Sequence, residues 1–409
     1  MNSVIYPSLK TANKINSYSW YDLYKRKNNS HISVPKEQSI KCNYLHTIVI
    51  VPNFTDHQKI ILDVWFNACI SIYNLTNSYI FHNLTNNNAN HFLNFINIRS
   101  SINNKIKYVC NKYSLNKHTG DYAVKHCVEM YKSAFANHKD ISKFNIKDMR
   151  CDRRRKNLVV ECGSICKTKN SFFSSILGDI ETNIPLKNIK HNCLLQFDAY
   201  KNTYKLIVPV DEKLDICVER EKKCGIDIGV RTFLTTYSET ESYEIGTNTN
   251  KIIDRSNNRL DKIKQAEASG RITNEEFIKL YMKYGDKMRN KIEDMHNKAA
   301  KFLLTRYDTI IIGNVSTKNM VSKLKGNLRK IVKRRLMILA HYKFRMKLIG
   351  MSKKYKVNII ETDEYLTTKK CCKCGKINDV GKEKVYKCSK CKLIIDRDIN
   401  SSINIYYDN

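Results

Sequence analysis

The chain has 409 residues, enough for two or three domains, and its 72 lysines and arginines exceed its 39 acidic residues to give a formal net charge of +33. A charge this large and this widely spread indicates a polyanionic partner such as nucleic acid. No apolar run approaches the roughly twenty residues of a membrane span, and no signal-peptide pattern is present, so we expect no membrane role and a reducing, intracellular compartment.

The N-terminal half is predicted to combine a β-barrel with a helical insertion. Residues 1–42 are polar and lack sustained periodicity, so we expect a flexible extension. Residues 43–54 contain the buried-strand sequence T-I-V-I-V-P, and together with strand-like runs in residues 150–220 they could close a small barrel. Residues 55–149 carry apolar positions at helical spacing from a cap at Thr55 onward, and they form the α-helical insertion.

Two basic stretches are candidate nucleic-acid-binding sites. The connector R-C-D-R-R-R-K concentrates like charges that repel one another unless phosphates neutralise them, which favours nucleic-acid contact over a solvated turn. Its candidate residues are Arg150, Arg153, Arg154 and Arg155. The second stretch is a basic amphipathic helix within residues 324–355, with candidates Lys330, Lys333, Arg334 and Arg335.

Residues 221–370 and 392–409 are predicted to form one mixed α/β layer, in which strands alternate with charged helices. Asp227 lies in the first strand among apolar neighbours. A carboxylate there is costly to bury unless it binds a cation or a proton, or pairs with an arginine of the core. We therefore expect Asp227 to be a metal ligand.

Residues 371–391 form a predicted zinc ribbon. Cys371, Cys374, Cys388 and Cys391 have the C-x2-C…C-x2-C spacing that presents four thiolates to one tetrahedral zinc ion. Four thiolates leave no position for water, so the zinc is expected to be structural, with Cys372 as a spare. Two disulfides or redox-active pairs are the alternatives, but the surrounding lysines and the lack of a secretory context favour zinc.

A second acidic residue follows the ribbon directly. Asp398 lies in D-R-D-I-N-S-S-I-N at the start of the last predicted helix, with Asp396 as an alternative or as an ion-pair partner. Three acids that converge at the edge of one sheet can hold two Mg²⁺ ions about 4 Å apart for phosphodiester hydrolysis. Asp227 and Asp398 would supply two of the three.

Three motifs follow one another in the C-terminal half: G-I-D-I-G, the four-cysteine ribbon and D-R-D-I-N-S-S-I-N. In their order and spacing they resemble the RuvC-like nuclease (RNase H fold) of TnpB proteins and of their eukaryotic and viral relatives, the Fanzors. The resemblance is specific from about Cys224 to the end of the chain. The N-terminal half is similar only in layout, with a wedge-like barrel and a helical recognition insertion. The resemblance implies an RNA-guided, transposon-associated DNA endonuclease with two catalytic Mg²⁺ ions and one structural Zn²⁺.

The third acid departs from the TnpB pattern. TnpB proteins place a Glu at the end of the strand that here reads I-I-I-G-N-V, where this chain has Gly313. This arrangement resembles that of the Fanzors, which supply the Glu from the neighbouring strand. The resemblance implies that Glu364 is the third acid here, with Glu361 and Asp363 as alternatives. Adjacent strands lie about 4.8 Å apart, so a Glu on the next strand can reach the same metal.

The resemblance further implies a guide RNA and a double-stranded DNA target with a short adjacent motif as partners, bound by a monomeric ribonucleoprotein. The Fanzor-like shift of the Glu fits the nucleus or viral factory of a eukaryotic host. Two other functions stay open. Gly313 suggests a catalytically inactive RNA-guided DNA-binding protein or repressor, and a transposase could use the same fold.

Overall fold

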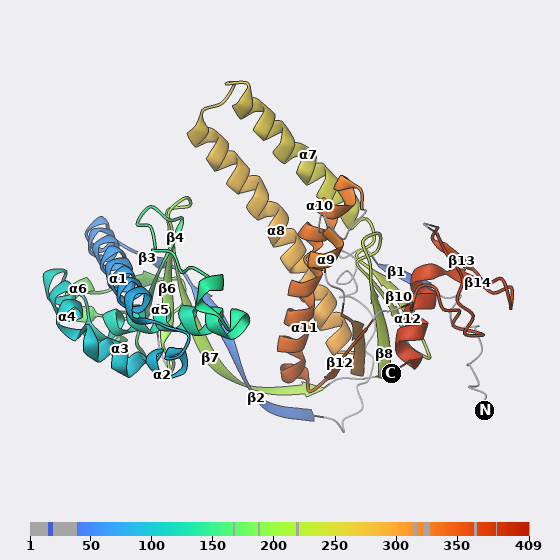
Figure 1. Ribbon diagram of the computed structural model, residues 1–409, viewed down its shortest axis with the longest axis horizontal. Helices are drawn as coiled ribbons and strands as arrows, with labels where there is room; N and C mark the ends of the chain where they lie inside the picture. The colour runs from blue at the N-terminus through green and yellow to red at the C-terminus, as the bar shows by residue number, and fades with distance from the viewer. Residues whose placement is uncertain are drawn as a thin grey trace. The chain divides into compact units, whose positions relative to one another are not determined.

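The computed structural model describes residues 39–166, 168–186, 189–217, 221–314, 317–321, 328–363, 366–381 and 383–408, together with the backbone of 15–18. The chain divides into two compact units (Figure 1). The N-terminal unit is Leu45–Glu212, and the C-terminal unit combines Met1–Tyr44 with Lys213–Asn409. Within the described ranges, no helix has the length and apolar character that crossing a membrane requires.

Helices make up much of the N-terminal unit. Its helices are α1 (Asp56–Asn83), α2 (Ala89–Phe92), α3 (Phe95–Ser101), α4 (Asn103–Lys112), α5 (Lys117–His138) and α6 (Ser174–Leu177), with 3-10 turns at Ile141–Lys143 and Cys162–Ser164. The predicted cap at Thr55 is confirmed, because its hydroxyl accepts from Gln58 N at 3.3 Å while Gln58 Oε1 accepts from Thr55 N at 2.9 Å. Helix α5 packs closely on α4, since a Cβ at Gly120 would lie 2.8 Å from Cys110 Sγ.

The strands of this unit form an open four-stranded sheet and a separate two-stranded sheet. One sheet has the order β2-β7-β6-β4, and β3 pairs with β5 separately. The bounds are β2 (Ser39–Ile50), β3 (Pro52–Asn53), β4 (Arg155–Val160), β5 (Glu181–Thr182), β6 (Cys193–Asp198) and β7 (Thr203–Cys217). Among the described residues no pairing joins β4 back to β2, so the predicted closed barrel is not found there. Helices α1 and α5 pack against β4. Because these helices bury the apolar residues of the strand, the sheet does not need to close into a barrel.

The C-terminal unit contains a six-stranded sheet of order β1-β10-β9-β8-β11-β12, so the predicted mixed α/β layer is confirmed. The bounds are β1 (Ile15–Tyr18), β8 (Glu221–Ile228), β9 (Leu234–Tyr237), β10 (Ser242–Ile245), β11 (Tyr307–Gly313) and β12 (Asn358–Thr362). Strands β8, β9 and β10 are antiparallel neighbours, and β11 pairs in parallel with both β8 and β12. Strand β1, from the segment predicted as a flexible extension, pairs in parallel with β10.

Helices cover both faces of this sheet. The helices α7 (Thr249–Ala268) and α8 (Asn274–Leu304) form a long hairpin (Figure 1), followed by α9 (Thr317–Val321), α10 (Lys330–Leu339) and α11 (His341–Tyr355). Buried Met295 and Phe344 of α8 and α11 pack with Ile312 in the core on one face. The other face receives α12 (Arg397–Tyr407), which lies so close that a Cβ at Gly225 would be 2.5 Å from Ser402 O.

Two buried histidines make this core sensitive to acid. The rings of His296 and His341 lie on the Phe233 ring at centroid distances of 5.2 and 5.4 Å, nearly parallel to it. Burial lowers the pKa of His296 to about 4 and the pKa of His341 to about 3. In the unfolded chain both histidines titrate near 6.5, so below that pH the unfolded state binds more protons than the folded state.

We therefore expect the C-terminal unit to lose several kcal/mol of stability as the pH falls from about 6.5 toward 4, since a pKa lowered by one unit is worth about 1.4 kcal/mol. Replacing His341 by leucine should reduce this loss. The measurement is the unfolding temperature of both proteins at each pH, where carboxylate effects cancel in the comparison. An identical loss in wild type and H341L would contradict the role of the histidine.

Candidate active site and metal centre

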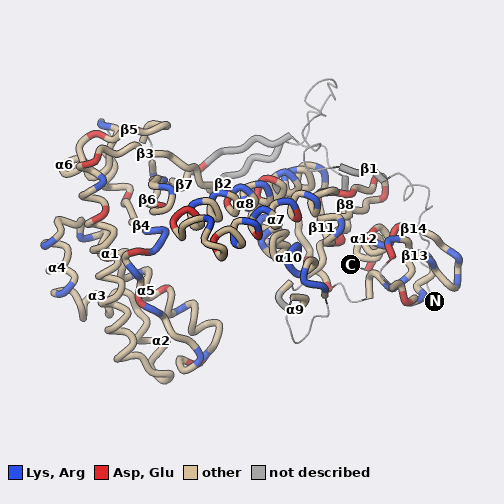
Figure 2. The backbone as a smooth tube through the Cα atoms, turned by 90° about the horizontal axis from the view of Figure 1, so that it is seen from above, with Lys and Arg blue, Asp and Glu red and all other residues tan. Residues whose placement is uncertain are grey.

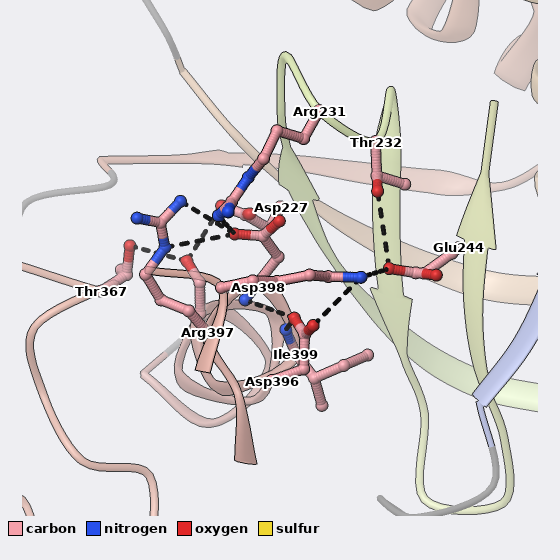
Figure 3. A network of polar contacts seen from close by, with 11 residues as sticks. Asp227, Arg231, Thr232, Glu244, Thr367, Asp396, Arg397, Asp398 and Ile399 are labelled. Carbon is pink, nitrogen blue, oxygen red and sulfur yellow. Dashed lines mark hydrogen bonds and ion pairs between the residues drawn. The ribbon is translucent and has the colours of Figure 1, made fainter. Parts of the chain in front are cut away.

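Strand β8 and helix α12 bring two of the three predicted acids together. Asp227 lies at the end of β8 and Asp398 in the first turn of α12, each with only 6% of its surface exposed. Figure 3 shows the two carboxylates beside each other. The Ser401 hydroxyl, also from α12, donates a hydrogen bond of 2.9 Å to Asp227 Oδ1. The site is thus assembled from residues that are more than 170 positions apart, as the 174-residue separation of Asp227 and Ser401 illustrates.

Asp227 is held in an environment that disfavours its charge. Burial, and next the negative charge of Asp398, raise the pKa of Asp227 to about 7, against weaker opposing effects of the Ser401 hydroxyl and Arg397. Two buried carboxylates in such proximity are stable together when a proton or a cation lies between them. Carboxylate oxygens are also the ligands that Mg²⁺ prefers, so the donor set fits that ion.

Two guanidinium groups flank Asp398. Arg397 Nη2 lies 3.2 Å and Arg231 Nη2 lies 3.6 Å from Asp398 Oδ1, and both arginines are drawn in Figure 3. The Arg231 side chain is 41% exposed, in the turn after β8, whereas Arg397 is more enclosed at 22%. Arg231 can therefore leave the carboxylate and reach a ligand, and Arg397 is the more fixed of the pair.

Asp396 has a different position from Asp398. Its Oδ1 accepts from the backbone N of Asp398 at 2.8 Å, which makes it the N-cap of α12, and its Oδ2 lies 3.3 Å from Lys384 Nζ. Of the two roles predicted for Asp396, the structure shows that of an ion-pair partner. Lys384 Nζ also lies 2.7 Å from Oε1 of Glu244, a buried residue of β10. The sequence carries no local signal for this link, because Lys384 and Glu244 are 140 residues apart.

The two asparagines of the D-R-D-I-N-S-S-I-N motif tie α12 to the segment that leads into the ribbon. Asn400 Nδ2 donates to Lys370 O at 2.8 Å, and Asn400 Oδ1 accepts from Cys372 N at 3.0 Å. Asn404 Nδ2 donates to Thr367 O at 2.7 Å. Sequence reasoning missed these contacts, although two asparagines four residues apart lie on the same face of a helix and indicate one polar interface.

The third acid, Glu364, lies outside the described residues, but the register of the sheet bears on its alternative Glu361. Ile312 of β11 is paired with Ile226 of β8 and with Glu361 of β12. Residues paired in parallel strands point to the same face, and successive residues alternate. Glu361 therefore shares the face of Ile226, opposite to Asp227. Its carboxylate lies 3.0 Å from Arg345 Nε of α11 on that face.

The four ribbon cysteines meet at one point. The sulfur atoms of Cys371, Cys374, Cys388 and Cys391 all lie within 4.8 Å of one another, with 3.6 Å for both Cys371–Cys391 and Cys374–Cys388. Sulfurs about 2.3 Å from a tetrahedral zinc are separated by nearly 4 Å, whereas a disulfide needs about 2.05 Å. The cluster thus fits a structural zinc ion. Cys372 is buried outside it.

The two halves of the ribbon have the same backbone geometry. Gly375 N donates to Cys371 O at 2.9 Å, and Lys392 N donates to Cys388 O at 3.1 Å. Both donors have positive φ, +70° for Gly375 and 57° for Lys392. The strands β13 (Val385–Lys387) and β14 (Ile394–Asp396) pair beside them. Each C-x2-C pair thus turns its two thiols toward the same point.

The basic candidates of α10 differ in their ion pairs and in their exposure to solvent. Arg334 makes two contacts with Asp261, at 2.7 and 3.0 Å, and Arg335 pairs with Asp254. Both acids belong to α7, so these two arginines hold α10 against α7. Lys330 is exposed at the start of α10, and Lys333 follows on the same helix with intermediate exposure.

The candidates of the connector are similarly divided. Arg150 pairs with Asp152, and both Arg154 and Arg155 pair with Asp198 on β6, at 3.1 and 3.7 Å. Arg153 lines a cavity of about 360 Å³ in the N-terminal unit. Of these four arginines, Arg153 has the side chain that faces a space large enough for a ligand.

Most of the chain is similar in sequence to known proteins. The profile described as "Probable transposase" (OrfB_IS605) matches residues 208–324, and the profile "Cas12f1-like, TNB domain" matches residues 341–405. TnpB-like protein L79 of Acanthamoeba polyphaga mimivirus is 32% identical over 382 residues, which cover 86% of this chain and 71% of that protein. TnpB-like protein L770 of the same virus is 33% identical over the same shares.

Among solved structures, a cryo-EM structure of a Cas12f1–sgRNA–target DNA complex contains a chain that is 15% identical. The similarity covers 89% of this chain and 99% of that chain, with a TM-score of 0.35. A CRISPR-Cas12f ternary complex has the same identity, with coverage of 85% and 82% and a TM-score of 0.32.

Proposed function

Since this chain belongs to the TnpB-like protein family, we propose that it is an RNA-guided DNA endonuclease that hydrolyses phosphodiester bonds with two Mg²⁺ ions. The observation that supports this most directly is the buried pair of Asp227 and Asp398, from β8 and α12. A structural scaffold gains nothing from a buried carboxylate whose pKa is raised by burial and by the charge of a second carboxylate beside it. A cation-binding site, by contrast, requires the negative charge of these two carboxylates.

The catalytic set in this proposal is Asp227, Glu364 and Asp398. Gly313 is one step beyond Ile312, so it lies level with Asp227, and its partner on β12 is Thr362. Glu364 itself lies outside the described residues, and the resemblance to Fanzors implies it as the third acid. Glu361, directed toward Arg345 on the opposite face, is the weaker candidate.

Mg²⁺ bound to these acids would activate a water molecule and stabilise the leaving 3′-oxygen. The Ser401 hydroxyl orients the carboxylate of Asp227. The cap at Asp396 and the Lys384 bridge to Glu244 fix the first turn of α12, and thereby Asp398. Arg231, half exposed beside Asp398, is placed to contact a phosphate of the substrate.

We expect Glu364→Gln to lower the cleavage rate at least about a thousandfold, because the amide removes a charged metal ligand. Glu361→Gln is the matched control three residues away, with the same change of charge, and should keep the rate within a few fold. Both rates are measured with reconstituted protein, guide and target DNA at saturating Mg²⁺. If the E361Q protein were the inactive one, the assignment of the third acid to Glu364 would be wrong.

The partners in this proposal are a guide RNA and double-stranded DNA with a short adjacent motif, held by a single copy of the chain. The net charge of +33 suits a protein that follows a nucleic-acid backbone over much of its surface. The basic candidates, Arg153 and Lys330 foremost, are proposed contacts to that backbone. Relatives in a virus of Acanthamoeba fit action in the nucleus or viral factory of a eukaryotic host.

A second candidate function is RNA-guided DNA binding without cleavage. It is favoured by Gly313, which leaves the strand between β8 and β12 without an acid at the level of Asp227. A transposase is the third candidate, and it would act without a guide RNA.

One experiment separates these functions. The chain is expressed with its native flanking DNA and purified at high salt, and any RNA that remains bound is sequenced. A discrete RNA with a variable end, followed by Mg²⁺-dependent cleavage of a matching DNA, is the expected result. A discrete RNA with target binding but no cleavage would select the repressor, and random RNA fragments would contradict guided activity altogether.

A further inference from the structure

The α7–α8 hairpin contains a small cavity whose lining is strongly basic. The cavity has a volume of about 170 Å³ and is lined by Arg255 and Arg259 of α7 and by Tyr284, Lys287 and Lys291 of α8. The two cations on each helix are four residues apart, so each pair lies on one helix face. Four positive charges therefore surround one space.

Five acidic side chains of the hairpin form ion pairs with cations that do not line the cavity. Asp254 pairs with Arg335, Asp261 with Arg334, Asp286 with Arg289, Asp294 with Lys298, and Glu293 with both Lys343 and Lys347. Across the described ranges, none of the four cations of the cavity has a carboxylate within ion-pair distance. Like charges held this close repel one another, and an anion in the cavity would relieve that repulsion.

One wall of the cavity is already ordered. The Arg259 guanidinium lies over the Tyr284 ring, with Cζ 3.9 Å from the ring centroid, and Nη2 donates to the Tyr284 hydroxyl at 2.6 Å. This contact restricts the arginine while its remaining N–H groups stay available as donors. A phosphate group fits a space of about 170 Å³.

The basic side chains continue beyond the cavity along both helices. Lys251 and Lys262 extend the row of Arg255 and Arg259 on α7, and Lys283 extends the row of Lys287 and Lys291 on α8. Figure 2 shows Lys and Arg recurring along the two helices. Four helical residues rise about 6 Å, so the rows offer repeated positive charge in a line. A polymeric anion uses such rows, whereas a single free phosphate uses one cavity.

We propose that the α7–α8 hairpin binds the sugar–phosphate backbone of nucleic acid, with one phosphodiester group in the cavity formed by Arg255, Arg259, Lys287 and Lys291. This site rests on the proposed function and adds to it a contact surface away from the acids of the active site. Its ligand is the phosphate charge shared by guide RNA and target DNA. Binding there is sequence-independent, because phosphate contacts carry no base information.

The test compares two double variants of α8 with the same loss of charge. Lys287→Gln with Lys291→Gln removes two cations of the cavity. Arg289→Gln with Lys298→Gln removes two cations that are paired with Asp286 and Asp294. Binding is measured for labelled single-stranded RNA, duplex DNA and an RNA–DNA heteroduplex of about 20 base pairs, the length of a guide–target duplex, over a range of salt concentrations.

The cavity variant is expected to bind at least one probe about tenfold more weakly near 0.15 M salt, and its log K against log salt slope should be smaller by about one to two. The control should keep the wild-type slope. The probe with the largest loss identifies the source of the phosphate. Equal losses in both variants, or no change in either, would overturn the site, and matched unfolding temperatures verify that both variants fold.

The outcome is independent of cleavage. A reduced salt slope in a chain that never cuts DNA would retain this site and remove the proposed nuclease activity. An unchanged slope in a chain that cuts DNA with its guide would remove this site and retain the proposed nuclease activity.

Discussion

Asp227→Ala is expected to abolish Mg²⁺-dependent DNA cleavage, by at least about a thousandfold, while RNA binding stays at the wild-type level. The carboxylate lies at the end of β8 beside Asp398, so its loss removes one wall of the proposed metal site. Apart from Arg231, the residues proposed to contact nucleic acid belong to other segments of the chain, in the connector, α10 and the α7–α8 hairpin. The measurement is the cleavage rate of a target plasmid by the reconstituted ribonucleoprotein, together with its affinity for the guide.

Asp227→Asn serves as the control for folding. It keeps the shape of the side chain and removes a buried charge next to Asp398, so we expect a higher unfolding temperature than in the metal-free wild type. A D227N protein that is more stable and inactive would show that the charge is retained for chemistry and not for folding. Cleavage that survives both substitutions would place the metal ions at other residues.

Cys371→Ser is expected to cost the ribbon its zinc ion. Four sulfurs within 4.8 Å of one another would share that ion, and binding free energies of structural zinc reach about 10 kcal/mol or more in small domains. Because Asn400 and Asn404 join the segment before the ribbon to α12, the disorder should spread to Asp398. We expect an unfolding temperature lower by roughly 10 °C and strongly reduced cleavage.

Cys372→Ser is the matched control, since its side chain is buried next to Cys371 but lies outside the cluster. It should retain one zinc ion per chain and most of the activity, because its contact to Asn400 uses the backbone N–H. Zinc content is measured by elemental analysis after dialysis against a chelator. Full zinc in C371S, or its loss in C372S, would refute the proposed ligand set.

Short-range patterns in the sequence were sufficient for much of the C-terminal unit. The C-x2-C pairs meet in space because each pair is closed by its own backbone turn, at Gly375 and at Lys392. Asp227 was recognisable because it interrupts an apolar segment, and Asp398 because it lies in the motif D-R-D-I-N-S-S-I-N directly after the ribbon. The barrel prediction failed among the described residues because strand-like runs do not reveal whether a sheet closes on itself or packs against helices such as α1 and α5.

The cluster of four cysteines, the two acids of the proposed site and the mixed α/β layer were all predictable from residue types and their spacing in the sequence. The bridge from Lys384 to Glu244, the hydrogen bond from Ser401 to Asp227 and the loss of Arg334 and Arg335 to ion pairs were not. These contacts join residues more than 70 positions apart. Only the packing of strands and helices brings such residues together, since strand register and helix docking depend on the whole core and not on any one segment.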